Sequence, residues 1–189
     1  MPEIIKRKLL HEGWNSFSLL TVRLDNGDTI ERIVEDHGPV AAVLPYDPVR
    51  KCATLVRQFR APAFVVDGRA DLLETIAGVI EDGDPAGCGR REAMEEAGLD
   101  LRELEHVASP WSTPGLSTER MHLYLAPYSA SDRTGSGGGL AHEQENITVE
   151  EIPLAELAAM ADRGGIEDMK TLTLLLTLRL KRPELFGKP

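Results

Sequence analysis

The chain has 189 residues, of which 42% are hydrophobic and 28% charged, and this suits one folded domain with a single core. Its 21 basic and 31 acidic residues give a net charge of −10, which argues against nucleic acids and anionic membranes as partners. Because no signal peptide is evident and no apolar run would span a bilayer, we expect a cytoplasmic protein.

The two cysteines, Cys52 and Cys88, are consistent with that compartment. They do not form a Cys-x-x-Cys pair, so they do not indicate a zinc site. A disulfide between them stays open, but buried thiols in a reducing setting are the expected state.

The first 38 residues favour β-strands. Residues 17–24 alternate and are rich in β-forming side chains, residues 25–28 (Asp-Asn-Gly-Asp) predict a tight turn, and residues 29–34 a returning strand. We therefore expect a small antiparallel extension over 1–38 before a main domain at 39–189. Trp14 stands just before these strands, where burial in a core or an interface is one explanation of its ring.

Two more strands are predicted over 39–45 and 53–59, and Arg57 and Arg60 lie at the end of the second. In an acidic protein such arginines are good phosphate ligands, because a guanidinium group can hold two oxygens at once. A solvent-facing charge is an equal alternative for Arg57.

A short helix is predicted after residue 84. Asp84 suits the N-cap, Pro85 the first helical position, and Gly98 the left-handed conformation that ends a helix. The helix carries the most informative residues of the chain.

Three of these are Glu92, Glu95 and Glu96, whose i, i+3 and i+4 spacing places their carboxylates on one side of the helix. The charges repel one another unless a cation compensates them. Hard oxygen ligands suit Mg²⁺ or Mn²⁺, especially when a substrate phosphate adds oxygens. Arg91 can reach Glu95 at i+4 and hold it. A solvated acidic face is the alternative interpretation.

The rest of the chain alternates predicted elements with loops. Strands are predicted over 104–109, 120–128 and 147–152, and helices over 154–163 and 168–181. The Gly-rich residues 129–142 predict a mobile lid that delivers Glu143 and Glu145. Lys170 begins the last helix, where the helix dipole does not favour a cation, so either a ligand contact or a plain surface position explains it.

The stretch from Ala77 and Gly78 to Arg91-Glu92-Ala93-Met94-Glu95-Glu96-Ala97-Gly98-Leu99 resembles the signature of the Nudix hydrolases. These enzymes cleave nucleoside diphosphates linked to another group. The second half of the signature matches in full. The first half is one residue short between Gly78 and Arg91, and Gly83 or Asp84 stands where the family has its first Glu.

The shortened loop resembles the GDP-mannose pyrophosphatase branch of the family. Further stretches of that branch occur in comparable places along nearly the whole chain: Arg57-Gln58-Phe59-Arg60, Gly137-Gly138-Gly139, a Glu before Asn146-Ile147, and Asp168-Met169-Lys170-Thr171. The resemblance implies an α+β fold, a Nudix α/β/α sandwich with a mixed central sheet plus the N-terminal β extension. It also implies a homodimer built with that extension.

The resemblance further implies a set of site residues. The metal ligands would be the Ala77 carbonyl, Glu92, Glu96, and Glu145 or Glu143, with Glu145 the better match as the residue that deprotonates water. Glu95 and Arg91 would assist catalysis, and Glu74 would line the same pocket. Substrate contacts would come from Trp14, Arg57, Arg60, Glu119 and Lys170.

These residues together predict Mg²⁺-dependent hydrolysis of a nucleoside diphosphate sugar, GDP-mannose before others, to GMP and mannose 1-phosphate. An ADP-ribose pyrophosphatase would use the same machinery. A non-catalytic ligand sensor and a scaffold domain are the alternatives from other classes, and the intact set of glutamates argues against both.

Overall fold

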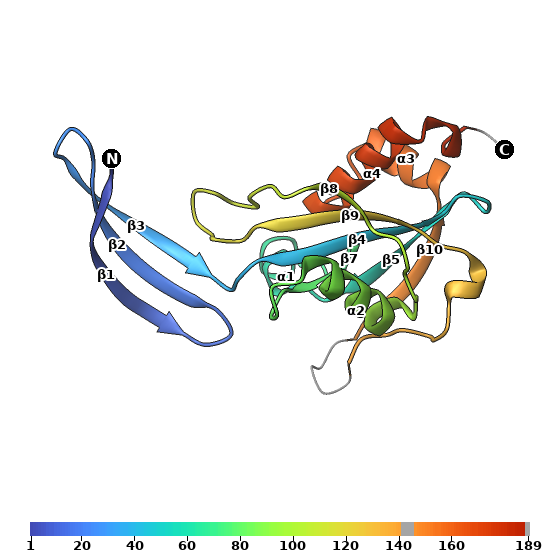
Figure 1. The fold of residues 1–189 in the computed structure, drawn as a ribbon, viewed down its shortest axis with the longest axis horizontal. Helices are drawn as coiled ribbons and strands as arrows, with labels where there is room; N and C mark the ends of the chain where they lie inside the picture. Colours follow the sequence, from blue (N-terminus) through green and yellow to red (C-terminus); the bar gives the residue numbers. More distant parts are fainter. Residues whose placement is uncertain (141–145, 188–189) are drawn as a thin grey trace.

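The computed structural model describes residues 1–140 and 146–187, and it shows an α+β fold made of two sheets. A three-stranded antiparallel sheet at the N-terminus projects from one end of the body (Figure 1). The body is built on a mixed seven-stranded sheet. The fold class expected from the sequence is therefore confirmed.

The strands fall into these two sheets in chain order. The N-terminal sheet has the order β1-β2-β3, with β1 (Glu3–Glu12), β2 (Ser16–Arg23) and β3 (Thr29–Asp36). The main sheet has the order β10-β5-β4-β9-β8, with β6 paired to β5 and β7 to β4. Its strands are β4 (Val40–Asp47), β5 (Cys52–Gln58), β6 (Leu72–Glu74), β7 (Ile76–Val79), β8 (Glu105–Ala108), β9 (Met121–Pro127) and β10 (Thr148–Pro153).

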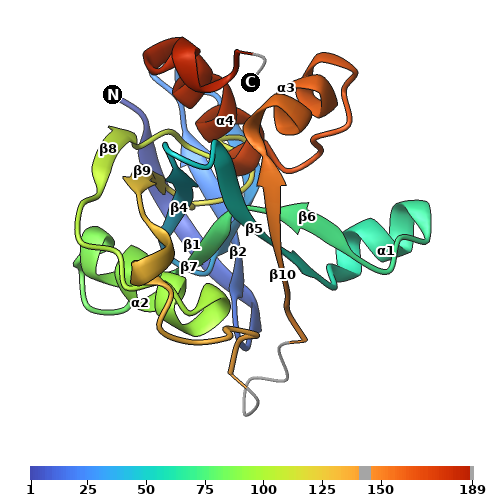
Figure 2. The ribbon, with the colours of Figure 1, turned by 90° about the vertical axis from the view of Figure 1, so that its right-hand side faces the viewer.

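Helices cover both faces of the main sheet (Figures 1 and 2). They are α1 (Ala61–Asp67), α2 (Pro85–Ala97), α3 (Leu154–Asp162) and α4 (Met169–Lys181), with short 3₁₀ turns η1 (Ala130–Asp132) and η3 (Pro183–Leu185). The described residues contain no helix long and apolar enough to cross a membrane.

Alternation along β4 explains the layers. Ala42 and Leu44 belong to the core shared with α3 and α4, while Val43 packs with Ala93 of α2 on the opposite face. Successive strand residues point to opposite faces of a sheet, so this fully buried strand supplies both cores. The helix α2 is thereby fixed against the centre of the sheet.

The ends of α2 match the sequence expectation. The Asp84 side chain accepts a hydrogen bond from the Gly87 amide, and Pro85 occupies the first turn. Gly98 takes a left-handed conformation (φ 65°), and its amide bonds the Met94 carbonyl. The helix is therefore held at both ends by local sequence signals.

Two features differ from the sequence expectation. The helix α1 was not predicted, because its seven residues bury no side chain and its apolar residues are consecutive, without a helical alternation of apolar and polar positions. The described part of the Gly-rich loop, up to residue 140, is bound to the end of α2 through the amides of Gly138 and Gly139. Its glycines permit a close backbone contact: a Cβ on Gly137 would lie 2.3 Å from the Glu96 carbonyl oxygen.

Candidate active site

Two neighbouring cavities lie where the N-terminal sheet meets the main sheet and α2. One has a volume of about 430 Å³ and the other about 300 Å³. Both are lined by Trp14, Arg60, Ala77, Gly78 and Val79. Because they share these walls, we treat them as two compartments of one site, within the size range of small-molecule pockets.

The acidic compartment, the smaller of the two, is lined by Glu92, Glu95 and Glu96. Glu96 is buried, with 2% of its surface exposed, and the other two are half-buried. Gly78 on β7 makes room for them, since a Cβ at this position would lie 2.2 Å from the Glu92 carboxyl carbon. The helical spacing thus places all three carboxylates on one cavity wall, as the sequence predicted.

The predicted partner of Arg91 is wrong. Its guanidinium donates to Glu92 Oε1 at 3.1 Å and not to Glu95. Arg91 also contacts the Cys88 thiol, at 3.5 Å. Helical spacing allows an i+4 contact, but the side-chain rotamer directs Arg91 back along α2 instead. Burial raises the pKa of the Cys88 thiol to about 11, so this cysteine is a neutral neighbour of the carboxylates.

The donor chemistry of the acidic compartment fits a hard divalent cation. Four glutamates, the three of α2 and Glu81, line it together with Ala77, and carboxylate and carbonyl oxygens suit Mg²⁺ as ligands. Within residues 1–140 and 146–187, no three His, Cys, Asp or Glu side chains are already gathered as a metal site. Glu143 and Glu145, the predicted loop ligands, lie outside the described residues.

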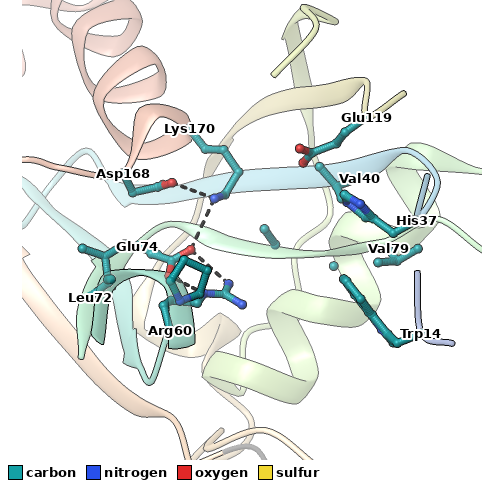
Figure 3. A pocket seen from close by; sticks show the side chains of 14 residues that line it. Trp14, His37, Val40, Arg60, Leu72, Glu74, Val79, Glu119, Asp168 and Lys170 are labelled. Atoms are coloured by element: carbon teal, nitrogen blue, oxygen red, sulfur yellow. Dashed lines mark hydrogen bonds and ion pairs between the residues drawn. The ribbon is translucent and has the colours of Figure 1, made fainter. Parts of the chain in front are cut away.

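The larger compartment has a charged wall built on Glu74. This buried carboxylate accepts from Arg60 at both oxygens (2.6 and 3.0 Å) and from Lys170 at 3.3 Å. Lys170 also donates to Asp168 at 2.6 Å. Figure 3 shows these four side chains together on one side of the cavity. Lys170 is therefore an internal residue of the site and not a surface lysine.

The pairing controls the charge state of both cations. Burial lowers the pKa of Lys170, but the charges of Asp168 and Glu74 outweigh it, and the net result is a raised pKa. The pKa of Arg60 is raised in the same way, against burial, by Glu74 and to a smaller extent by Glu96. Both side chains are positive at neutral pH and largely neutralised by their partners.

The opposite wall carries aromatic rings. The indole of Trp14 and the imidazole of His37 are stacked, with centroids 5.2 Å apart and planes 15° apart. Figure 3 shows both rings across the cavity from Arg60 and Lys170. His37 Nδ1 lies 2.8 Å from Glu35 Oε1, which fixes the orientation of the imidazole ring.

Glu35 also fixes the loop that carries Glu119. Its carboxylate accepts from Ser117 at 2.6 Å and from Asn15 at 3.2 Å. Ser117 Oγ in turn accepts from the Glu119 amide at 3.1 Å. Hydrogen bonds to and through Glu35 therefore connect the segments that carry Glu119, Trp14 and His37, although these segments are far apart in the sequence.

Arg57 lies away from both compartments. It lines a different hollow, with Asp71 and Glu167, and is paired with Glu150 (2.6 Å) and Asp71 (3.5 Å). Strand alternation explains this position, because Arg57 points from the sheet face opposite to that of its neighbour Val56. The structure brings the other described candidates together, namely Trp14, Arg60, Ala77, Arg91, Glu92, Glu95, Glu96, Glu119 and Lys170.

Sequence reasoning missed His37 and Asp168 as site residues. Asp168 belongs to the Asp-Met-Lys-Thr stretch, and its N-cap bond to the Thr171 amide was a local signal for its position. No local signal marked His37, because its ring partner Trp14 is 23 residues away in the sequence.

Comparisons with known proteins show the family of the chain. The model of the NUDIX domain matches residues 36–174. A GDP-mannose pyrophosphatase of Salmonella arizonae is 38% identical over 185 residues, covering 94% of each chain. Those of Pectobacterium atrosepticum (37%, covering 92% of this chain and 91% of the relative) and Cronobacter sakazakii (38%, 95% of each) are similar.

A solved structure also shares the fold. The crystal structure of an ADP compounds hydrolase aligns with a TM-score of 0.76, covering 97% of this chain and 95% of the other, at 16% sequence identity. The match of the family model over most of the chain, with the carboxylates of α2 on one cavity wall, leads to one conclusion. The chain belongs to the Nudix hydrolase family.

Proposed function

We propose that the protein hydrolyses the diphosphate bond of a nucleoside diphosphate sugar, with GDP-mannose as the preferred substrate and GMP and mannose 1-phosphate as products. The observation that carries this proposal is the pairing of an acidic compartment with an aromatic, carboxylate-lined one across shared walls. Relatives at about 38% identity named GDP-mannose pyrophosphatase support the choice of sugar nucleotide.

The diphosphate belongs in the acidic compartment. Glu92 and Glu96, with the Ala77 carbonyl, would hold Mg²⁺, and Mn²⁺ would suit the same oxygen ligands. When bound, such cations offset the charge of the diphosphate and lower the pKa of a bound water. Members of this family typically use a divalent metal. Arg60 lies at the boundary of the two compartments. Glu74 offsets part of its charge, but the guanidinium would still donate hydrogen bonds to phosphoryl oxygens as charge gathers there.

The carboxylates of this chain also handle the proton. We propose that the glutamate of the loop before Asn146 accepts a proton from the attacking water, with Glu145 preferred over Glu143 because it aligns better with the family pattern. Water oxygen bonds to one phosphorus, and the bridging oxygen leaves with the other phosphate. One water is consumed for each diphosphate cleaved.

The larger compartment suits the purine or the sugar. Arg60 and Lys170 are already paired with Glu74 and Asp168. This wall therefore has little net positive charge and suits an uncharged group better than a phosphate. Glu119 supplies a carboxylate able to accept hydrogen bonds from N–H or O–H groups. Guanine presents N–H donors on its Watson–Crick edge where adenine presents an acceptor at N1, which favours a guanine nucleotide here.

We further propose that two copies of the chain associate through the N-terminal sheet, which would form a unit over 1–38 beside the Nudix domain at 39–189. Several large apolar side chains of this sheet are exposed in the single chain: Ile4, Ile5, Leu9, Leu10 and Ile33. Exposed apolar surface of this extent is typical of a protein interface. The edge of β1, paired only to β2, would also gain from a partner.

Product analysis tests the proposed reaction. The protein is incubated with GDP-mannose and Mg²⁺, and the products are separated by ion-exchange chromatography. We expect GMP and mannose 1-phosphate in equal amounts. Release of GDP and free mannose would place the cleavage at the glycosidic bond and would contradict the proposal.

A further inference from the structure

Carbonyl groups at the end of α2 accept hydrogen bonds from residues 133–139 of the Gly-rich loop, here called segment 133–139. A helix leaves its last four carbonyls without partners inside the helix. In α2 the Glu95 carbonyl accepts from the Gly139 amide (3.1 Å) and the Glu96 carbonyl from the Gly138 amide (2.9 Å). Both residues whose carbonyls are used carry a carboxylate of the acidic compartment. Segment 133–139 thus sets the position of the last turn of α2.

Of the other two carbonyls, that of Met94 accepts from the Gly98 amide, and that of Ala97 accepts from a side chain. Arg133 Nη1 donates to it at 2.7 Å, and Nη2 of the same guanidinium donates to Glu151 at 2.9 Å and to Thr54 at 3.4 Å. Glu151 lies on β10 and Thr54 on β5. A single planar group therefore connects the end of the helix to two strands of the sheet.

Glu151 is a firm anchor for this connection. Its carboxylate also accepts two bonds from Arg50 (2.9 and 3.1 Å) and one from the Tyr128 hydroxyl (2.8 Å). Arg50 is held in turn by Asp47. The cluster contains two cations and two anions, so its charges balance. Loss of Arg133 would leave Glu151 still paired with Arg50.

We propose that Arg133 is a positioning residue for the diphosphate hydrolysis proposed above: its guanidinium ties the last turn of α2, which carries Glu95 and Glu96, to Glu151 on the sheet. This inference rests on the proposed function. Displacement of a reacting group by about 1 Å can lower a rate roughly 100-fold, so a tie at the helix end influences turnover without contacting substrate. The next residue of the segment beyond Gly139, Leu140, lines the acidic compartment.

Arg50 offers a matched control. Both arginines donate to the Glu151 carboxylate, but Arg50 contacts neither α2 nor segment 133–139 in the bonds described for it. Arg50→Gln therefore weakens the cluster and leaves the tie to Ala97 in place, whereas Arg133→Gln removes the tie. Arg133→Lys supplies a point charge that reaches one acceptor better than two.

The experiment compares the full-length wild type with Arg133→Gln, Arg133→Lys and Arg50→Gln. It measures kcat and KM for GDP-mannose with saturating Mg²⁺, the thermal midpoint, and amide exchange of Gly138 and Gly139 without metal or substrate. For Arg133→Gln we expect kcat to fall roughly 10- to 100-fold with KM changed less than about threefold, and faster exchange of both amides.

Arg133→Lys should recover part of kcat, and Arg50→Gln should keep wild-type kcat and exchange despite a lower thermal midpoint. Equal loss of kcat in the Gln variants of Arg133 and Arg50 would show a general effect of stability and overturn the inference. Unchanged exchange and kcat in Arg133→Gln would also overturn it.

If Arg133→Gln does not fold, wild-type kcat in Arg133→Lys with unchanged exchange decides against the inference. A wild type inactive on every sugar nucleotide tested would refute the proposed function itself, whereas a failure confined to the variants would leave that function standing.

Discussion

At the scale of single residues, Gly78 is the position where backbone space controls a carboxylate. A Cβ there would overlap Glu92, whose carboxyl carbon would lie 2.2 Å away. Because Glu92 is a flexible side chain, Gly78→Ala should displace it at little cost in stability. We expect activity to fall at least about tenfold, as for loss of a group that orients a ligand, while the thermal midpoint changes little.

Gly115→Ala is the control, since a Cβ at residue 115 meets nothing within 4 Å. Steady-state kinetics and thermal unfolding of the two variants give the comparison. Equal activity in Gly78→Ala and Gly115→Ala would show that the position of Glu92 does not matter.

Glu96 is the buried carboxylate of the acidic compartment, and its charge is central to the proposed cation site. Glu96→Gln keeps the shape of the side chain and removes the charge. Because loss of an outer-shell partner of a metal already costs roughly 10- to 100-fold, we expect a larger loss of turnover here, and the same for Glu92→Gln.

The exposed Glu103 lies outside both compartments, so Glu103→Gln should retain full activity. Circular dichroism checks that each variant is folded. Near-normal turnover in Glu92→Gln or Glu96→Gln would remove these residues from the site.

The residue scale also shows what the sequence could predict. The i, i+3, i+4 spacing of Glu92, Glu95 and Glu96 was sufficient to predict their common cavity wall, because helix geometry alone places the three side chains on one side of the helix. The partner of Arg91 was not predictable, since several acceptors were within its reach and the rotamer decides among them. His37 was missed because its neighbours come from other segments.

At the scale of elements, the positions of the helices and strands other than α1 followed from local signals. The caps of α2 and the turn between β2 and β3 were predicted from Asp84, Gly98 and the Asp-Asn-Gly-Asp stretch. The sequence predicted a mobile lid for the Gly-rich residues but not the contact of their described part with α2, because glycine gives a chain freedom but also permits close contact, and composition does not distinguish the two. The backbone bonds to α2 make that distinction.

The charged cluster around Glu151, on β10, predicts how the stability of the protein depends on pH. Hydrogen bonds from Arg50 above all, then from Tyr128 and Arg133, lower the pKa of Glu151 to about 2 against the opposing effect of burial. Since this pKa is below the ordinary value of 4.5, the stabilisation is complete above about pH 4.5 and is lost as the pH falls toward 2.

After allowance for solvent screening, the contribution should be about 1–2 kcal/mol. Denaturant unfolding between pH 7 and pH 3 measures it. We expect Glu151→Gln to be less stable than the wild type at pH 7 and the difference to shrink at pH 3. A difference that stays constant with pH would show that the ionised carboxylate is not the source.

At the scale of the whole molecule, the N-terminal sheet would serve both association and the site. It presents exposed apolar side chains to solvent and Trp14 to the larger compartment. We expect the protein to elute as a dimer of about twice 20.7 kDa in size-exclusion chromatography with light scattering.

Leu9→Glu should shift it to the monomer, because a charge would be buried in the interface. Val49→Glu, at an exposed apolar position in the turn after β4, is the control and should remain dimeric. A wild type that is monomeric at micromolar concentration would contradict the proposed association.

The central claim concerns the whole site, with its acidic and aromatic compartments acting on one substrate. The most direct test is phosphate-coupled turnover of GDP-mannose, GDP-glucose, ADP-ribose, ADP-glucose and UDP-glucose, each with and without Mg²⁺. We predict Mg²⁺-dependent turnover with a clear preference for GDP-mannose. Preference for ADP-ribose would contradict the assigned specificity but keep the chemistry, and absence of turnover across the panel would contradict the proposed activity and favour a ligand-binding role.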